Sequence, residues 1–102
     1  MQTLQIPQAT AADAAAISAL QHQLGYPIAP ADTEIRLRAL SATGHDPVFV
    51  LRRAGDILGV MALHRAPSLN YAGGVARIMA IVVAEQARGQ GLGRHLVAHA
   101  EA

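Results

Sequence analysis

The sequence predicts an α/β (α+β) fold: a mixed, mainly antiparallel sheet flanked by helices, with elements in the order β-α-α-β-β-β-α. Ile17, Leu20 and Leu24 recur at the i, i+3 and i+7 spacing of a helix that buries one face. Two short apolar runs surround a tight turn at residues 54–56, which is the pattern of a hairpin. A nearly continuous apolar run at 75–83 then leads through a glycine-rich turn into a last amphipathic segment.

The first elements in order are a short strand and a helix. Leu4 and Ile6 alternate with polar neighbours, as in a strand with one buried face. Thr10 is a predicted N-cap, and Asp13, three positions later, is an acid that fits a capping box. We therefore expect a helix over residues 11–23.

Glycine and proline separate this helix from the next one. Residues 24–30 contain one glycine and two prolines, which break a helix. A second helix is predicted over residues 31–40, where Glu34 and Arg38 form an i, i+4 ion pair. Residues 41–47 are polar and predict a loop.

Three strands and a final helix follow. Residues 48–51 and 57–63 predict two strands of a hairpin, and residues 65–74, with a proline and a glycine pair, predict a loop. The run at 75–83 is apolar at almost every position. A strand covered on one face only would alternate, so this run predicts burial on both faces. The segment from residue 92 to the end predicts the last helix.

Composition and charge exclude several classes of function. The chain has 102 residues, enough for one domain, and is 52% hydrophobic but only 3% aromatic, which predicts an aliphatic core. A net charge of +1, with no basic run beyond Arg52-Arg53, argues against nucleic-acid binding. The absence of Cys excludes disulfides and thiol catalysis. With neither a signal peptide nor a membrane-length apolar run, the chain is expected to be cytoplasmic and free of membrane contact.

The stretch that connects the 75–83 strand to the last helix predicts an anion site. Gly89, Gly91 and Gly93 leave alternate positions free of Cβ atoms where a strand turns into a helix. The first N–H groups of a helix have no internal partners, and its dipole is positive there. Arg88 and Arg94 add full positive charges at either end. The stretch therefore predicts a phosphate cradle made of main chain.

Two common phosphate-binding loops do not fit this stretch. A P-loop ends in Gly-Lys-Ser/Thr, whereas Gly93 is followed by Arg94 and His95. A dinucleotide-binding fingerprint starting at Gly89 needs Gly or Ala at position 94 and an acid about twenty residues further on. The sequence ends at Ala102.

The stretch resembles the acetyl-CoA motif of the GNAT superfamily of N-acetyltransferases, Gln/Arg-x-x-Gly-x-Gly/Ala. Arg88, Gly91 and Gly93 fill its positions, directly after an apolar strand and at the start of a helix. The predicted element order also matches the first part of a GNAT domain. The resemblance implies an enzyme that uses acetyl-CoA as cosubstrate. It would acetylate a primary amine, on a small molecule or a peptide, by direct attack within a ternary complex.

The resemblance places the cofactor contacts mainly on the backbone. Amides of residues 89–94 would hold the pyrophosphate, and the strand end at 81–83 would pair with pantetheine and donate an N–H to the thioester carbonyl. Arg88 would either contact phosphate or pin the loop. The implied cofactor-binding residues are Ile81, Val82, Val83, Arg88, Gly89, Gln90, Gly91, Leu92, Gly93 and Arg94.

The resemblance covers the N-terminal two thirds of a GNAT domain. It implies that residues 1–102 form a single domain truncated after the third helix, without the strand that splays away from the 75–83 strand to admit pantetheine. The 75–83 strand would then keep an unpaired edge, a template for pairing with another copy. We therefore expect a homo-oligomer formed through this strand.

No catalytic residue or metal ligand is assigned from the sequence. Glu85 is at best an exposed proton acceptor. Tyr26 and Tyr71 are not at the position of the family's usual acid, although Tyr26 lies in a turn that shapes the acceptor site in the family. His64 either lines an acceptor pocket or is satisfied by backbone. His95 and His99 have an i, i+4 spacing but lack the Glu of a His-Glu-x-x-His site, and predict a solvated helix flank.

Two other functions stay open at this point. The chain could be a non-catalytic module that binds CoA. It could also be a self-associating fragment in which the glycine-rich stretch at residues 88–94, the glycine loop, is only a turn. A CoA-binding module would be stabilised by CoA without releasing it from acetyl-CoA, whereas CoA would leave a purely structural oligomer unchanged.

Overall fold

The computed structural model describes residues 3–101 and confirms the predicted order of strands and helices. Four strands form one antiparallel sheet in the order β1-β2-β3-β4. Two short 3₁₀ helices, η1 and η2, precede α1 and α3. The elements are β1 (Leu4–Gln5), η1 (Ala11–Asp13), α1 (Ala14–Gln23), α2 (Pro30–Thr43), β2 (Val48–Arg53), β3 (Asp56–Ala66), β4 (Val75–Val83), η2 (Glu85–Ala87) and α3 (Leu92–Glu101).

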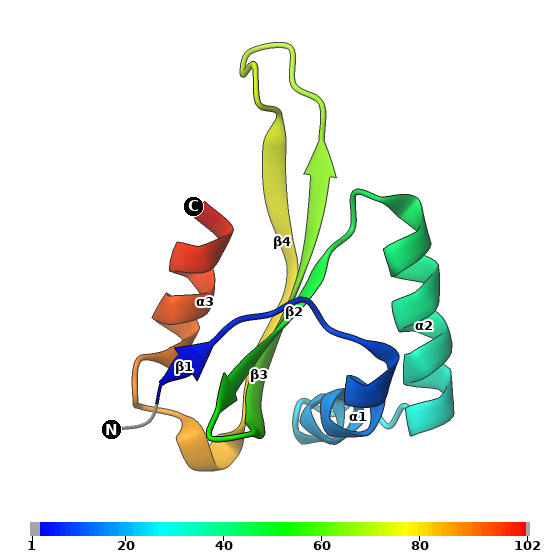
Figure 1. Cartoon of the computed structure of the whole chain (residues 1–102), viewed down its shortest axis with the longest axis vertical. Coiled ribbons are helices and arrows are strands. Elements are labelled where there is room, and N and C mark those ends of the chain that lie inside the picture. Colours follow the sequence, from blue (N-terminus) through cyan, green and yellow to red (C-terminus); the bar gives the residue numbers. More distant parts are fainter. Residues whose placement is uncertain (1–2, 102) are drawn as a thin grey trace.

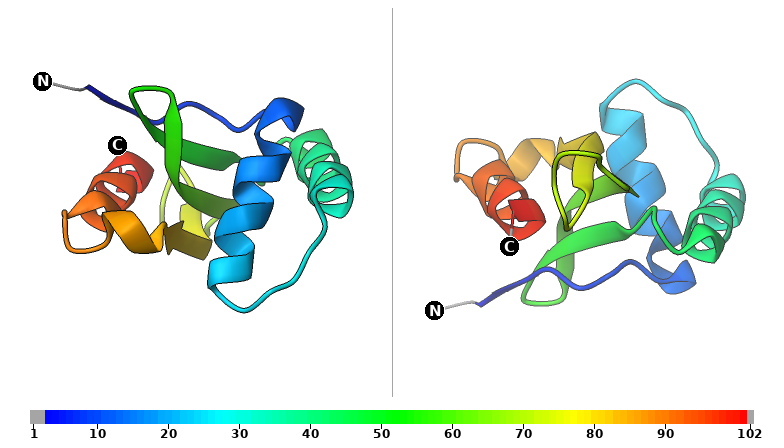
Figure 2. Two further views of the ribbon diagram at one scale, coloured as in Figure 1. Left: turned by 90° about the horizontal axis from the view of Figure 1, so that it is seen from below. Right: turned by 90° about the horizontal axis from the view of Figure 1, so that it is seen from above.

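Helices cover the sheet on both faces (Figure 1). Helices α1 and α2 lie on one face and α3 lies on the other, as Figure 2 shows from both ends. Leu96 of α3 is fully buried against Gly59 of β3. A Cβ atom at Gly59 would lie 3.2 Å from the Leu96 side chain and 3.2 Å from the Val82 carbonyl oxygen, so glycine permits the close approach of α3 to the sheet.

The start of the first helix follows the predicted capping pattern. The Asp13 carboxylate accepts a hydrogen bond from the Thr10 backbone N–H at 2.8 Å. The first turn is the 3₁₀ helix η1, and α1 continues from it. Asp13 is buried and also accepts a hydrogen bond from Arg52 of β2 at 2.5 Å, which ties the helix start to the sheet.

Several helices and strands are longer than the sequence predicted. Helix α2 begins at Pro30 and runs beyond residue 40, because the next residue that stops a helix is Gly44, in the left-handed conformation at φ 78°. Strands β2 and β3 both extend to the hairpin turn. Ala54 and Gly55 form that turn with positive φ values of 53° and 86°, as a two-residue hairpin loop requires.

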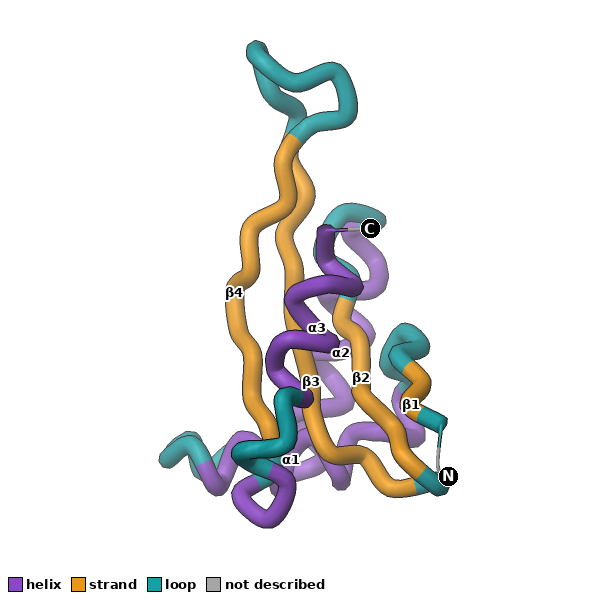
Figure 3. Tube along the Cα trace, turned by 90° about the vertical axis from the view of Figure 1, so that its left-hand side faces the viewer, coloured by secondary structure: helices purple, strands orange, loops and turns teal. Residues whose placement is uncertain are grey.

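The prediction that the 75–83 strand is buried on both faces is wrong. Strand β4 has the predicted bounds, but it is an edge strand of the described sheet (Figure 3). Met79 is 61% exposed and Val75 is 45% exposed, whereas Val82, near α3, is buried. A continuous apolar run indicates burial on both faces only for a strand inside a sheet. Here the far end of the β3–β4 hairpin projects beyond the helices (Figure 1).

The remaining helix has the predicted start. Helix α3 begins at Leu92, and its predicted end at residue 102 lies outside the described residues. Leu92 and Leu96 are buried, while Val97 is 36% exposed, so Leu92 and Leu96 form the side of α3 that reaches the core. None of the described helices is both long and apolar enough to span a membrane.

Candidate functional site

The outer edge of β4 presents backbone groups that have no partner among the strands of the described residues. The Ala84 N–H donates to the Leu58 carbonyl oxygen at 2.8 Å, which makes these two residues a hydrogen-bonded pair. Pairing alternates along an antiparallel ladder, so Val82 also directs its N–H and C=O toward β3. Ile81 and Val83 therefore direct theirs away from the sheet, toward the open edge.

A β-bulge interrupts the same strand. The register passes from Ala62 opposite Ala80 to Leu63 opposite Ile78, which leaves Met79 as an extra residue on β4. Bulges bend a strand and re-aim its backbone groups, and they occur often beside active sites. The bulge therefore separates the lower part of β4, next to the glycine loop, from the projecting hairpin (Figure 3).

The glycine loop has the conformation of an anion cradle. Gly89 and Gly91 have φ values of 84° and 75°, which favour glycine, and Gly93 lies in the first turn of α3. Left-handed residues that alternate with ordinary ones turn successive N–H groups toward one concave side. The N–H groups of residues 92–94 lie in the first turn of α3, where a helix offers them no acceptor, and the first bond of the helix is donated by the His95 N–H to the Gly91 carbonyl oxygen at 3.4 Å.

These amides border a hollow of about 250 Å³. It is lined by Val83, Ala87, Arg88, Gly89, Gly91, Leu92, Gly93 and Arg94. A Cβ atom built at Gly93 meets nothing within 4 Å, so the space at the mouth of α3 is open rather than filled by side chains of the chain itself. Arg94 is exposed beside it. An anion could therefore reach the free N–H groups and the positive end of the helix dipole.

Three side chains hold the loop in position. The Arg88 Nε donates to the Val83 carbonyl oxygen at 3.2 Å, and the Arg53 Nη1 donates to the Gln90 Oε1 at 2.7 Å. The Gln23 Oε1, at the end of α1, accepts from the Glu85 N–H at 2.8 Å. Gln23 and Arg53 were not singled out in the sequence, because each lies far along the chain from the motif and no local pattern connects them to it.

A second hollow, of about 430 Å³, lies beside the bulge. It is lined by Gln21, Leu24, Tyr26, Ile28, Met79, Ala80 and Ile81. Tyr26 is 56% exposed and is the one titratable side chain among the described residues that line this hollow. The connection between α1 and α2 is fastened at Ile28, whose carbonyl oxygen contacts the Ser18 Oγ at 2.5 Å and the His22 Nε2 at 3.1 Å.

The other residues considered in the sequence lie elsewhere. Tyr71 is 65% exposed in the loop at the tip of the β3–β4 hairpin, at the opposite end of β4 from the glycine loop (Figure 1). Glu85 is exposed at the start of η2. His95 is exposed, and the ring of His99 packs edge-on against Phe49 with ring centroids 4.8 Å apart.

His64 is satisfied by a carboxylate instead of backbone. Its Nδ1 lies 2.5 Å from the Asp46 Oδ1, in the loop that follows α2. The hydrogen bond from His64, together with one from Thr43, holds the pKa of Asp46 below its ordinary value. His64 does not line the hollow beside the bulge.

Comparisons with known proteins identify the family and the fold of the chain. Residues 12–102 match the family model described as the acetyltransferase (GNAT) family. No curated protein sequence matches the chain. A GNAT family acetyltransferase from Staphylococcus aureus superposes with a TM-score of 0.85 at 22% identity, over 99% of this chain and 76% of that one.

Two further solved structures share the fold. Glucosamine-6-phosphate N-acetyltransferase from Arabidopsis thaliana superposes with a TM-score of 0.78 at 20% identity, over 97% of this chain and 72% of that one. An aminoglycoside N-acetyltransferase in complex with CoA has a TM-score of 0.80 at 17% identity, over 99% of this chain and 68% of that one.

Proposed function

This chain belongs to the acetyltransferase (GNAT) family, and from that premise we propose that it transfers the acetyl group of acetyl-CoA to a primary amine. The observation that carries the proposal is the first turn of α3, where the N–H groups of residues 92–94 have no acceptor within the helix and border an open hollow. A diphosphate is the anion of CoA that fits such a set of donors. A solved structure of similar fold contains CoA.

The edge of β4 would receive the pantetheine arm. Ile81 and Val83 direct backbone donors and acceptors to the open edge, and an extended amide chain can pair with such an edge as an added strand. The Val83 carbonyl oxygen already accepts from Arg88, so the Val83 N–H and both backbone groups of Ile81 carry this part of the proposal. Val82 contributes packing, since its backbone faces β3 and its side chain is buried.

The reaction would take place between the glycine loop and the bulge. The lone pair of the neutral amine attacks the thioester carbonyl, the C–N bond forms as the C–S bond breaks, and the proton lost by nitrogen goes to the thiolate of CoA. A backbone N–H at the open edge near Ile81 would stabilise negative charge on the carbonyl oxygen. The hollow beside the bulge would hold the acceptor, with Tyr26 at its border.

Deprotonation of the amine needs a base, because an ammonium group has no lone pair. The described residues that line the hollow offer neither a carboxylate nor an imidazole. We therefore propose that an ordered water takes the proton that the ammonium group loses before the attack. The proton that nitrogen loses during the attack goes to the thiolate.

We further propose that the chain pairs with a second copy through β4. The edge of this strand is unpaired among the described strands, and Ile78 and Met79 expose 40% and 61% of their surface along it. Such an edge is a template for another strand. A second copy and pantetheine would then compete for the backbone of Ile81 and Val83.

Two titrations test the proposed function. Acetyl-CoA and CoA are added to the purified chain while its melting temperature is followed, and thiol release from acetyl-CoA is then measured over a panel of small amines and peptides. Stabilisation by CoA with amine-dependent thiol release supports an acetyltransferase. Stabilisation without thiol release supports a non-catalytic module that binds CoA. Unchanged melting in saturating CoA would remove the proposal, because N–H groups free for a diphosphate would then not bind one.

A further inference from the structure

Three potential metal ligands meet where the loop after α2 lies against β3. The ligating atoms of His45, Asp46 and His64 all lie within 4.8 Å of one another. The Asp46 carboxylate stands between the two imidazoles, with Oδ1 2.5 Å from the His64 Nδ1 and Oδ2 3.1 Å from the His45 Nδ1. The ring centroids are 5.5 Å apart and the rings are at 88° to each other, so the two imidazoles are perpendicular and not stacked.

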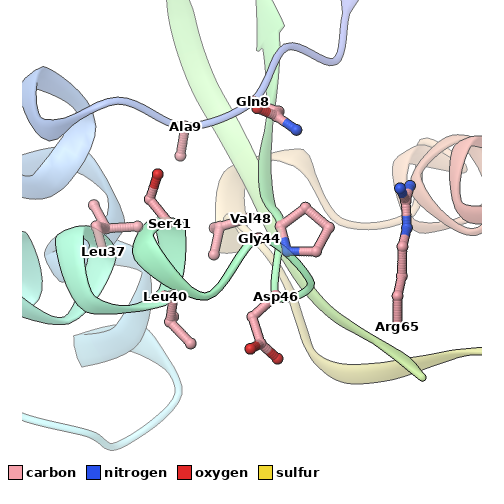
Figure 4. Close-up of a pocket in the computed structure, with 10 residues that line it drawn as sticks. Gln8, Ala9, Leu37, Leu40, Ser41, Gly44, Asp46, Val48 and Arg65 are labelled. Atoms are coloured by element: carbon pink, nitrogen blue, oxygen red, sulfur yellow. The ribbon is translucent and has the colours of Figure 1, made fainter. Parts of the chain in front are cut away.

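The backbone around these residues is fixed. The Leu63 N–H donates to the Pro47 carbonyl oxygen at 2.9 Å, and the Arg65 N–H donates to the His45 carbonyl oxygen at 2.8 Å. The loop therefore runs beside β3 on either side of His64. Figure 4 shows Asp46 at this junction, next to a hollow of about 190 Å³ that Arg65 also lines.

A neighbouring hydroxyl holds the carboxylate. The Thr43 Oγ1 donates to the Asp46 Oδ2 at 2.7 Å and accepts from the His45 N–H at 3.2 Å. A hydrogen bond of this kind to a ligand carboxylate is typical of the shell around a metal. The carboxylate is largely shielded, with 16% of its side chain exposed, while the two imidazoles keep solvent access at 57% and 41%.

We propose that His45, Asp46 and His64 bind a divalent transition metal of the zinc class. Two imidazole nitrogens and one carboxylate oxygen are ligands that zinc accepts, and three protein ligands leave a fourth position for water. Ligands about 2.0–2.1 Å from a tetrahedral ion lie roughly 3.4 Å apart. One ligand atom from each of the three residues already lies within 4.8 Å of the other two, so side-chain rotations of about one ångström bring them to this spacing.

Binding would fasten the end of α2 to β3. His45 and Asp46 come from the loop after α2, and His64 comes from β3, so the ion would join this loop to the strand. The site lies toward the other end of the sheet from the glycine loop (Figure 1). The ion would therefore stabilise the folded chain by mass action without entering the proposed transfer site.

The test is a zinc titration of untagged, chelator-treated protein, followed by calorimetry and by melting temperature. We expect one ion per chain and a rise in melting temperature. His64→Gln and, separately, His45→Gln should each weaken binding by more than about tenfold. His95→Gln is the matched control, because it removes an exposed imidazole from α3, where His95 and His99 have the other metal-compatible spacing. It should leave binding unchanged.

The same titration can overturn the proposal. The proposal fails if zinc does not bind to the native chain. It also fails if zinc binds with native affinity to each of the two single variants, His45→Gln and His64→Gln. It also fails if His95→Gln removes binding, because the ion would then sit on α3. His45 is mostly exposed, so its substitution keeps the test valid even if His64→Gln were to unfold the chain. None of these outcomes depends on CoA or on amine acetylation.

Discussion

The Arg88 Nε donates a hydrogen bond to the Val83 carbonyl oxygen, 3.2 Å away. This contact closes the turn between the end of β4 and the start of α3, and it uses one of the two outward-facing backbone groups of Val83. The guanidinium therefore leans toward the strand end. The main chain, more than this side chain, supplies the free donors of the loop.

Replacement of Arg88 distinguishes a loop-pinning residue from a phosphate ligand. We expect Arg88→Ala to lower the free energy of unfolding by about 1 kcal/mol, the net value of one hydrogen bond. It should also weaken CoA binding by about fivefold. Arg88→Lys should behave similarly, because lysine keeps the charge but lacks the Nε–H of the contact. Calorimetric titration with CoA checks this, and a lysine variant with nearly native affinity would instead indicate a direct phosphate contact.

The backbone conformation requires glycine at one position of the loop and not at another. Gly91 has φ 75°, so Gly91→Ala should lower the free energy of unfolding by about 1 kcal/mol or more. Gly93 has an ordinary helical backbone and open space at its Cβ position, so Gly93→Ala should raise it by up to about 1 kcal/mol. Urea unfolding of the two variants measures the contrast. Equal effects of the two substitutions would show that the loop does not hold this conformation in solution.

Gly93 also permits a test in which stability and binding change in opposite directions. A carboxylate in the first turn of α3 favours the helix dipole, so Gly93→Glu should fold at least as well as the native chain. The same charge would stand in the proposed diphosphate site and weaken CoA binding by at least about tenfold through repulsion. Gly93→Gln is the neutral control of equal size. If the two variants bind CoA equally, the diphosphate does not dock at this mouth.

The parts of the fold that were predictable depend on local signals. The bounds of the 75–83 strand and the start of α3 follow from an apolar run and a glycine turn, and the structure has both. The prediction that this strand is buried on both faces was wrong, because burial depends on neighbouring elements that a local sequence pattern does not identify. The end of α2 was missed because Ser41 and Thr43 are polar yet compatible with a helix, and the stop comes at Gly44.

The candidate site also combines features that follow from local sequence with features that depend on distant residues. The positions of Gly89 and Gly91 were predictable, since both adopt the left-handed backbone that glycine allows. The bulge at Met79 was not, because it depends on the register between β3 and β4. Neither were the contacts of Gln23 and Arg53, which join the loop to α1 and β2 across long separations in sequence.

The Asp13–Arg52 contact should be the most sensitive ion pair of the chain to single substitution. Asp13 is 4% exposed and accepts hydrogen bonds from the Thr10 N–H, the Thr10 hydroxyl and Arg52, so Asp13→Ala removes three hydrogen bonds to one buried charge. We expect a loss of about 2–3 kcal/mol in the free energy of unfolding. Glu34→Ala, which breaks an exposed pair with Arg38, should cost no more than about 0.5 kcal/mol. Comparable losses in the two variants, measured by denaturant unfolding, would contradict this account.

Self-association through β4 is expected to grow with protein concentration in light scattering. Ile78→Lys places a charge on the unpaired edge, where lysine discourages strand pairing, and should shift the population toward monomer. Leu69→Lys is the matched control, because it makes the same chemical change in the loop beyond the edge, at a side chain that is fully exposed. It should leave association unchanged.

Saturating CoA provides the last test of this edge. Pantetheine and a second copy would need the same outward-facing groups of Ile81 and Val83, so CoA should shift the native chain toward monomer. Because Ile78 lies on the other side of the bulge from these groups, Ile78→Lys should still bind CoA. A native chain that is monomeric at every concentration would contradict pairing through β4. Association that CoA leaves untouched would show that copies pair without using Ile81 and Val83.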